Sequence, residues 1–148
     1  MSSLRAVLIV VLCFAGAALA QTAPTGSVAI FKNISGQVVV LRDGAAVTPR
    51  VGSELFRTDS VRSGPDGSAG IVFTDGTRVA IGASTEVAIR QYVFEPGEGK
   101  YDFDVYLTKG SAVYASGRLG KLSPEAVRLS TPRATTGVRG TRFILKEE

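Results

Sequence analysis

The 148-residue chain has no histidine, no tryptophan and a single cysteine, Cys13. Histidine is the usual base in serine and cysteine hydrolases, and histidine and cysteine are the main protein ligands of transition metals. The lack of these residues excludes Ser-His-Asp and Cys-His mechanisms and nearly every transition-metal site. The first apolar stretch is also shorter than the roughly 20 residues that a membrane-spanning helix needs.

The first 20 residues are typical of a secretory signal peptide. Arg5 precedes an apolar stretch, and Ala18-Leu19-Ala20 gives the small-x-small pattern of a cleavage site. We expect cleavage after Ala20, which makes the protein periplasmic or secreted, with no membrane segment afterwards; an uncleaved anchor is the alternative. Cys13 leaves with this peptide, so the mature fold depends on its core without any disulfide.

The charge of the chain is mild and spread along its length. There are 17 basic and 13 acidic residues, a net charge of +4. The nearest approach to a basic cluster is formed by Arg128, Arg133, Arg139 and Arg142. No alternation of basic and aromatic residues accompanies them, so we expect a solvated face and no nucleic-acid partner.

The residues after Ala20 predict strands almost throughout and almost no helix. Tyr101, Phe103, Val105 and Leu107 alternate with other residues at period two, the pattern of a half-buried strand. Similar short runs occupy residues 28–31, 38–41, 69–73, 79–81, 87–89, 127–129 and 143–145. Glycines separate the runs, and Asp75-Gly76 is the strongest hairpin signal.

This spacing of short strands predicts an all-β domain. The two arrangements that fit are a compact β-solenoid-like fold and a rolled β-sandwich of short strands. Residues 95–99 and 116–124 are expected to be exposed polar loops, because they interrupt the apolar pattern without a helical period.

Carboxylates are the remaining candidates for catalysis. Asp59, Asp66, Asp75 and Glu86 lie in one stretch, and carboxylate pairs supply the acid and base of glycosidases. Asp66 and Asp75 each precede a glycine, however, and in such turns the aspartate side chain bonds its own backbone. The dense oxygen cluster of a calcium site is also missing. We therefore expect no enzymatic activity, no cofactor and no metal.

The segment from Thr136 to Thr141 looks at first like a glycine-rich phosphate loop. Such loops precede a helix, whereas the residues that follow, 142–145, predict a strand. Pro132 and Gly137 are expected at turns, and Gly140 at a close approach of two backbones. The neighbouring threonines can satisfy local amides and carbonyls.

Two groups of motifs together resemble the FecR domain of bacterial envelope proteins. The first is Leu55-x-x-x-Asp59-x-Val61-x-Ser63-Gly64 followed by Gly67-x-Ala69-x-Ile71-x-Phe73-x-Asp75-Gly76-Thr77. The second is Thr131-Pro132-Arg133-Ala134 followed by Gly137-Val138-Arg139-Gly140-Thr141-x-Phe143. The resemblance predicts a FecR-like domain at residues 36–148, after a lead-in and first strand at 21–35. Thr58 stands where the family usually has glycine.

The resemblance implies a non-catalytic periplasmic domain that binds protein partners. In the ferric-citrate regulator that names the family, a cytoplasmic segment controls a sigma factor and the periplasmic part senses an outer-membrane receptor. The expected signal peptide leaves no cytoplasmic arm here, and we expect no receptor-contacting module after Glu148. We therefore expect a protein-interaction or signalling and scaffold module of the envelope. The alternatives are a glycan or peptidoglycan-binding module, and an in-trans component of iron-responsive signalling to a sigma factor.

The residues expected to form the motif or an interaction surface are Asp59, Asp75, Gly76, Thr131, Pro132, Gly137, Arg139, Gly140 and Thr141. Arg139 can direct its donors to strand-end carbonyls or to a carboxylate such as Asp59 or Asp75. Direct contact with a partner is the alternative role. If the partner is a glycan, the candidates for stacking on sugars are Tyr92, Tyr101, Tyr106 and Tyr114.

Overall fold

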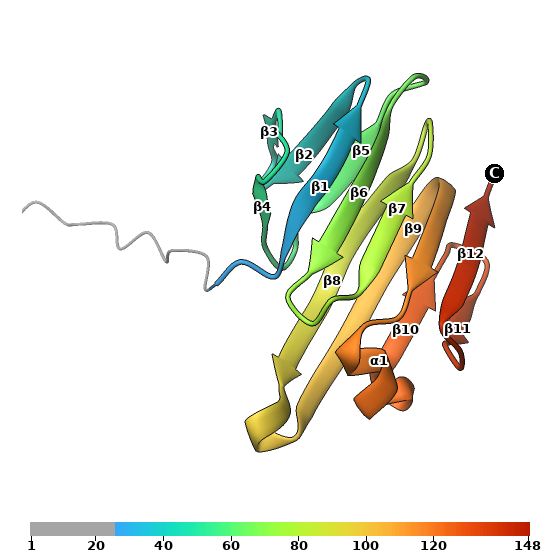
Figure 1. Cartoon of the computed structure of the whole chain (residues 1–148). Coiled ribbons are helices and arrows are strands. Elements are labelled where there is room, and N and C mark those ends of the chain that lie inside the picture. Colours follow the sequence, from blue (N-terminus) through green and yellow to red (C-terminus); the bar gives the residue numbers. More distant parts are fainter. Residues whose placement is uncertain (1–25) are drawn as a thin grey trace, which may run out of the picture.

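The computed structural model describes residues 26–148, so the expected signal peptide at residues 1–20 lies outside the described residues. The described chain forms one sheet of twelve strands that curls into an open half-barrel (Figure 1). The strands are β1 (Ala29–Ser35), β2 (Val38–Arg42), β3 (Ala45–Val47), β4 (Glu54–Leu55), β5 (Ser60–Ser63), β6 (Ser68–Phe73), β7 (Arg78–Ile81), β8 (Glu86–Glu95), β9 (Lys100–Ala115), β10 (Val127–Ser130), β11 (Thr135–Gly137) and β12 (Arg142–Glu147). The all-β prediction is confirmed; the finer choice between a solenoid-like and a rolled-sandwich arrangement is not.

The long strand β9 connects the two halves of the sheet. Its first part pairs with β8 and β10, and its last part pairs with β7 and β12. We call these the β8 half (β3, β2, β5, β8, β10 and β11) and the β7 half (β4, β1, β6, β7 and β12). Gly110 lies where β9 passes from one to the other, with φ +92°, and a Cβ atom there would collide with Thr85. Glycine is the residue that permits this backbone.

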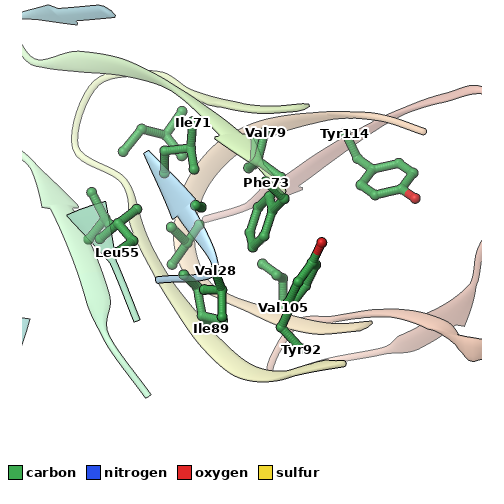
Figure 2. Close-up of a cluster of buried hydrophobic side chains, with 14 of the residues drawn as sticks. Val28, Leu55, Ile71, Phe73, Val79, Ile89, Tyr92, Val105 and Tyr114 are labelled. Atoms are coloured by element: carbon green, nitrogen blue, oxygen red, sulfur yellow. The ribbon is translucent and has the colours of Figure 1, made fainter. Parts of the chain in front are cut away.

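The core lies on the concave side of the curled sheet. Strand β6 alternates exposed and buried residues, as its period-two pattern predicts. Phe103 contacts three rings, with centroid distances of 5.0 Å to Phe73, 6.0 Å to Tyr92 and 5.6 Å to Tyr114. Figure 2 shows side chains from both halves converging on this cluster. Burial of each large apolar side chain contributes about 1.5–3 kcal/mol, so this shared core holds the halves together.

The predicted hairpin at Asp75-Gly76 is present. Gly76 joins β6 to β7 with φ +86°, and its amide donates to the Phe73 carbonyl at 2.9 Å. The predicted loop at residues 116–124 is partly wrong, because helix α1 (Arg118–Leu122) occupies it and the short helix η2 (Pro124–Ala126) follows. The predicted acidic loop is exposed and contains one 3-10 turn, η1 (Pro96–Glu98).

Helix α1 could not be recognised from local sequence because its main support comes from far along the chain. It has only five residues, and no side chain of its N-cap residue, Gly117, is available to bond its first amides. The Leu119 amide instead donates to a carboxylate oxygen of Asp75, 44 residues away in sequence, at 2.9 Å.

Thr58 provides a test of backbone strain in this fold. Its φ of +71° is left-handed, which costs a β-branched residue about 1–2 kcal/mol. Glycine avoids that strain, but its greater conformational entropy in the unfolded chain lowers the free energy of unfolding by about 0.4–1 kcal/mol. We therefore expect Thr58→Gly to raise the free energy of unfolding by roughly 0.5 kcal/mol in a denaturant titration. Thr58→Ala keeps a Cβ atom and should change less; a lower midpoint for the glycine variant would contradict the strain.

Candidate interaction site

Asp75 lies at the base of the site, in the turn between β6 and β7. It is only 3% exposed, and its carboxylate accepts four hydrogen bonds. Two come from Thr77, through its amide at 3.2 Å and its hydroxyl at 2.6 Å. The other two come from the Tyr92 hydroxyl and the Leu119 amide, each at 2.9 Å. One side chain thus joins a turn, strand β8 and helix α1.

Helix α1 is seated directly on this turn. The Arg118 amide donates to the Asp75 carbonyl at 2.9 Å, and the Gly117 amide donates to the Thr77 hydroxyl at 3.2 Å. A Cβ atom at Gly117 would collide with the Thr77 amide nitrogen, so the close approach requires glycine. Leu119 is fully buried beneath the helix. The position of α1 is therefore fixed by the Asp75 turn.

The segment after β11 lies opposite α1 and η2. Val138 is buried, and its amide donates to the Val127 carbonyl at 3.4 Å. The Thr141 carbonyl accepts a hydrogen bond from the Ser116 amide at 2.8 Å. Gly140, which directly precedes Thr141, has φ +137°. With Val138 turned inward, Arg139 is left exposed.

Together these segments line an open surface groove of about 760 Å³, which we call the C-terminal groove. Its lining residues are Ser116, Gly120, Lys121, Pro124, Glu125, Gly137, Val138, Arg139, Gly140, Thr141 and Phe143. Figure 1 shows α1 beside β10, near the end of the sheet that carries β11 and β12.

The charges around the groove are mixed. Lys121 and Arg139 are exposed cations, and within residues 26–148 Arg139 makes no hydrogen bond or ion pair. Glu125 supplies a negative charge, because the Ser123 hydroxyl donates to its carboxylate at 2.6 Å and holds the pKa of Glu125 below its ordinary value. The groove lining thus carries two cations and one anion.

A buried hydroxyl without a partner lies behind the groove lining. Tyr114 is 1% exposed, and its hydroxyl makes no hydrogen bond of standard geometry in the described chain, although the nearby side chains of Ser116 and Thr77 offset part of the rise in its pKa that burial causes. A Cβ atom at Gly120 would lie 2.9 Å from this hydroxyl and still closer to the Ser116 hydroxyl. Figure 2 shows the Tyr114 hydroxyl pointing away from Phe73 and Val79. The groove is therefore backed by an unsatisfied polar group, which is uncommon in a protein core.

The predicted motif residues fall in three places. Gly137, Arg139, Gly140 and Thr141 line the groove, and Asp75 with Gly76 lies beneath it. Thr131 and Pro132 form the turn between β10 and β11, outside the groove lining; the Thr131 amide donates to the Ala134 carbonyl at 2.7 Å. The Thr131 hydroxyl accepts the Arg133 and Ala134 amides at 3.3 and 3.2 Å.

Asp59 belongs to a separate cluster. It is 1% exposed and accepts a forked pair of bonds from Arg42, with Nη2 to Oδ2 at 2.7 Å and Nε to Oδ1 at 3.0 Å. The Phe56 amide donates to the same carboxylate at 2.9 Å. These hydrogen bonds raise the pKa of Arg42. Asp59 therefore links the segment that directly precedes β5 to Arg42 in β2.

Three sequence-based expectations need correction. Arg139 contacts neither Asp59 nor Asp75, because other donors occupy both carboxylates, and it bonds no strand-end carbonyl of the described chain. Gly137 lies in β11 without a positive φ, not in a turn. A Cβ atom at Gly140 would approach the Phe143 ring at 3.4 Å, so the close neighbour of Gly140 is a side chain and not a second backbone.

The sequence pattern did not predict helix α1, which forms one side of the groove. It also did not show which of the four tyrosines are buried. Tyr92 and Tyr114 are core residues, so they are closed to sugars. Arg90 lies 3.7 Å from the centre of the Tyr106 ring and covers it. Tyr101, half-buried, packs against Phe94 at 6.1 Å.

A family model described as FecR protein matches residues 59–148, more than half of the chain. The chain belongs to the FecR family. The match includes the Asp75 turn, α1 and the whole C-terminal groove of this FecR protein. Residues 36–58 lie outside it, so the predicted domain start stays a prediction, although β1 and β2 pair with β6 and β5 of the matched range.

The other comparisons add no relative. No curated protein and no solved structure matches this FecR protein. None of the helices in residues 26–148 is long and apolar enough to cross a membrane.

The first test of the site concerns Asp75. Asp75→Ala leaves the amides of Thr77 and Leu119 and the Tyr92 hydroxyl without their acceptor, at about 1–3 kcal/mol for each buried donor. We expect the FecR domain to lose at least about 3 kcal/mol of unfolding free energy, measured by chemical denaturation. Glu98→Ala, which removes an exposed ion pair with Lys100, should leave the midpoint unchanged. Equal effects of the two substitutions would contradict this role for Asp75.

The second test compares two buried tyrosines. Tyr92 bonds Asp75 and Thr74, whereas the Tyr114 hydroxyl has no partner in residues 26–148. Near pH 7, Tyr92→Phe should cost about 1–2 kcal/mol of unfolding free energy, while Tyr114→Phe should change it by less than about 0.5 kcal/mol. Equal losses in denaturation experiments would show that the Tyr114 hydroxyl is satisfied.

The same pair gives a pH dependence. Burial raises the pKa of both phenols above the ordinary value of 10.0. The fold favours the neutral phenol, so this contribution to stability is complete below pH 10.0 and is lost as the pH rises through the folded pKa. The unfolding free energy should therefore fall in alkali, and it should fall less steeply in Tyr92→Phe than in the wild type.

Proposed function

We propose that this FecR protein is a non-catalytic interaction module of the bacterial envelope, located in the periplasm or secreted. On this proposal the C-terminal groove binds a segment of an envelope protein. The observation that carries it is Arg139: the second group of FecR-like motif residues forms one side of the groove and presents a guanidinium with no hydrogen bond or ion pair in the described chain.

The chemistry around Arg139 suits a peptide. Its planar group offers several donors, which fit carboxylates and backbone carbonyls. Phe143 and Val138 supply apolar lining. An exposed arginine beside apolar lining is one of the residue types that contribute most to protein interfaces. These features support a protein partner over a purely structural role for the motif.

A binding role without catalysis also agrees with how the two motif carboxylates are used. Asp59 and Asp75 are buried and accept hydrogen bonds from Arg42, Thr77, Tyr92 and backbone amides. Neither is placed to exchange protons with a substrate. Family membership supports a part in envelope signalling, in which the groove relays an interaction to a second protein in trans.

The glycan alternative has less support. Two of the four tyrosines expected to stack on sugars are core residues, and Arg90 covers a third. A protein partner is therefore the reading that the groove favours.

The test is a capture experiment with envelope extract. Mature protein on beads is compared with Arg139→Ala and with Arg50→Ala, a control at an exposed arginine outside the groove lining. We expect mass spectrometry to find an envelope protein retained by the wild type and by Arg50→Ala, with at least a roughly tenfold loss in Arg139→Ala, as for a central interface residue. The melting temperature should not change, because the side chain of Arg139 makes no hydrogen bond or ion pair within residues 26–148.

Two outcomes would overturn the proposal. One is retention that is identical for Arg139→Ala and the wild type. The other is co-sedimentation with purified peptidoglycan that depends on Arg139, without any protein captured, which would select the glycan-binding alternative. A lowered melting temperature for Arg139→Ala would return the residue to a structural role.

A further inference from the structure

The convex face of β6, β7, the end of β9 and β12 differs in charge from the rest of the sheet; it leaves out β1 and β4 of the β7 half, where Glu54 is exposed. The outward positions of β6, β7, the end of β9 and β12 alternate with buried ones. They are Ser68, Gly70, Val72, Arg78, Ala80, Ser111, Val113, Ala115, Arg142, Ile144 and Lys146. They include three cations, no carboxylate and no aromatic residue. This face is therefore positive over a surface of small side chains.

The two arginines on this face lie on either side of one small residue. Arg78 and Arg142 are both paired with Ala115, one from each neighbouring strand. Two strand spacings place their Cα atoms roughly 10 Å apart. A cavity of about 400 Å³ lies between them over Ala80, Val113 and Ala115, with Thr141 at its edge. We call this cavity the outer notch.

The β8 half provides the contrast. On its convex face Arg62 bonds Glu86 at 3.1 Å, Arg128 bonds Asp102 at 2.9 Å, and Arg90 covers the Tyr106 ring. In the described chain the guanidinium groups of Arg78 and Arg142 make no hydrogen bond or ion pair. Strands β7 and β12 lie on either side of β9, so the two like charges repel each other across Ala115. An anion in the notch removes that repulsion.

We propose that the outer notch takes a carboxylate side chain from an acidic, extended segment of a protein partner. Each guanidinium can bind a carboxylate through two parallel hydrogen bonds. The alanine and valine floor accepts the aliphatic part of a glutamate. A lipid surface fits less well, because apart from Ile144 the face lacks the large apolar and aromatic side chains that enter a bilayer. The notch shares only Thr141 with the C-terminal groove and does not depend on it.

The experiment uses a fluorescein-labelled peptide of four Glu-Val repeats and the mature protein. Fluorescence anisotropy at low salt should show saturable binding, and Arg78→Gln with Arg142→Gln should raise Kd at least tenfold. The matched control is Arg62→Gln with Arg90→Gln, which removes the same charge from the other half and should change Kd less than twofold. Ala115→Leu fills the notch without a change of charge and should raise Kd about fivefold or more. Ala80→Leu is the second filling variant if Ala115→Leu does not fold.

The results separate a built site from diffuse attraction. Equal weakening by the two double variants, or no effect of the filling variants, would overturn the notch in favour of general electrostatic attraction. Absence of peptide binding, or Arg78-dependent binding to phosphatidylglycerol vesicles without peptide binding, would overturn the acidic peptide as occupant. Arg139→Ala should leave peptide affinity unchanged, so failure of the groove proposal and failure of this one are distinguishable. Thermal melts establish that each variant is folded.

Discussion

The Asp75 carboxylate is buried among hydroxyl and amide donors, and no ion pair to it occurs in residues 26–148. A buried charge of this kind is stable only when its oxygens are saturated with hydrogen bonds. Those donors come from the β6–β7 turn, from β8 and from the start of α1. Helix α1 forms one side of the C-terminal groove. The shape of the groove therefore depends on the hydrogen bonds that the protein donates to this one carboxylate.

The second buried motif carboxylate is satisfied differently. Asp59 has the forked guanidinium of Arg42, which also lies 4.7 Å from the centre of the Phe56 ring. Loss of one partner of such a pair leaves an uncompensated buried charge. Two aspartates that looked alike in sequence therefore play related structural parts at separate places, and neither depends on Arg139.

Features that follow from local pattern were predictable from sequence. Period-two alternation identified β6 and β9, and Asp75-Gly76 identified its hairpin, because both depend on residues adjacent in the chain. The groove was not predictable. Its helix depends on a bond between Asp75 and Leu119, and its opposite side depends on how Val138 packs beneath Val127. The ion pair expected between Arg139 and Asp59 or Asp75 could not be judged from sequence for the same reason. Arg42 bonds the Asp59 carboxylate and Thr77 bonds the Asp75 carboxylate.

Strand β9 has a consequence for the order in which the fold is completed. Strands β3, β2, β5 and β8 form one chain of neighbours, and β7, β6, β1 and β4 form another; in the strand order only β9 joins the two. Until residues 100–115 are synthesised, β7 and β8 each keep an open edge on the side that β9 later covers. Strand β8 joins β9 through a short hairpin, whereas β7 pairs with the far end of β9, and such non-local pairings form slowly and leave intermediates exposed. We therefore expect the sheet to be completed late in folding, when β9 pairs with both groups of strands. Gly110, with its positive φ, lies within this joining strand.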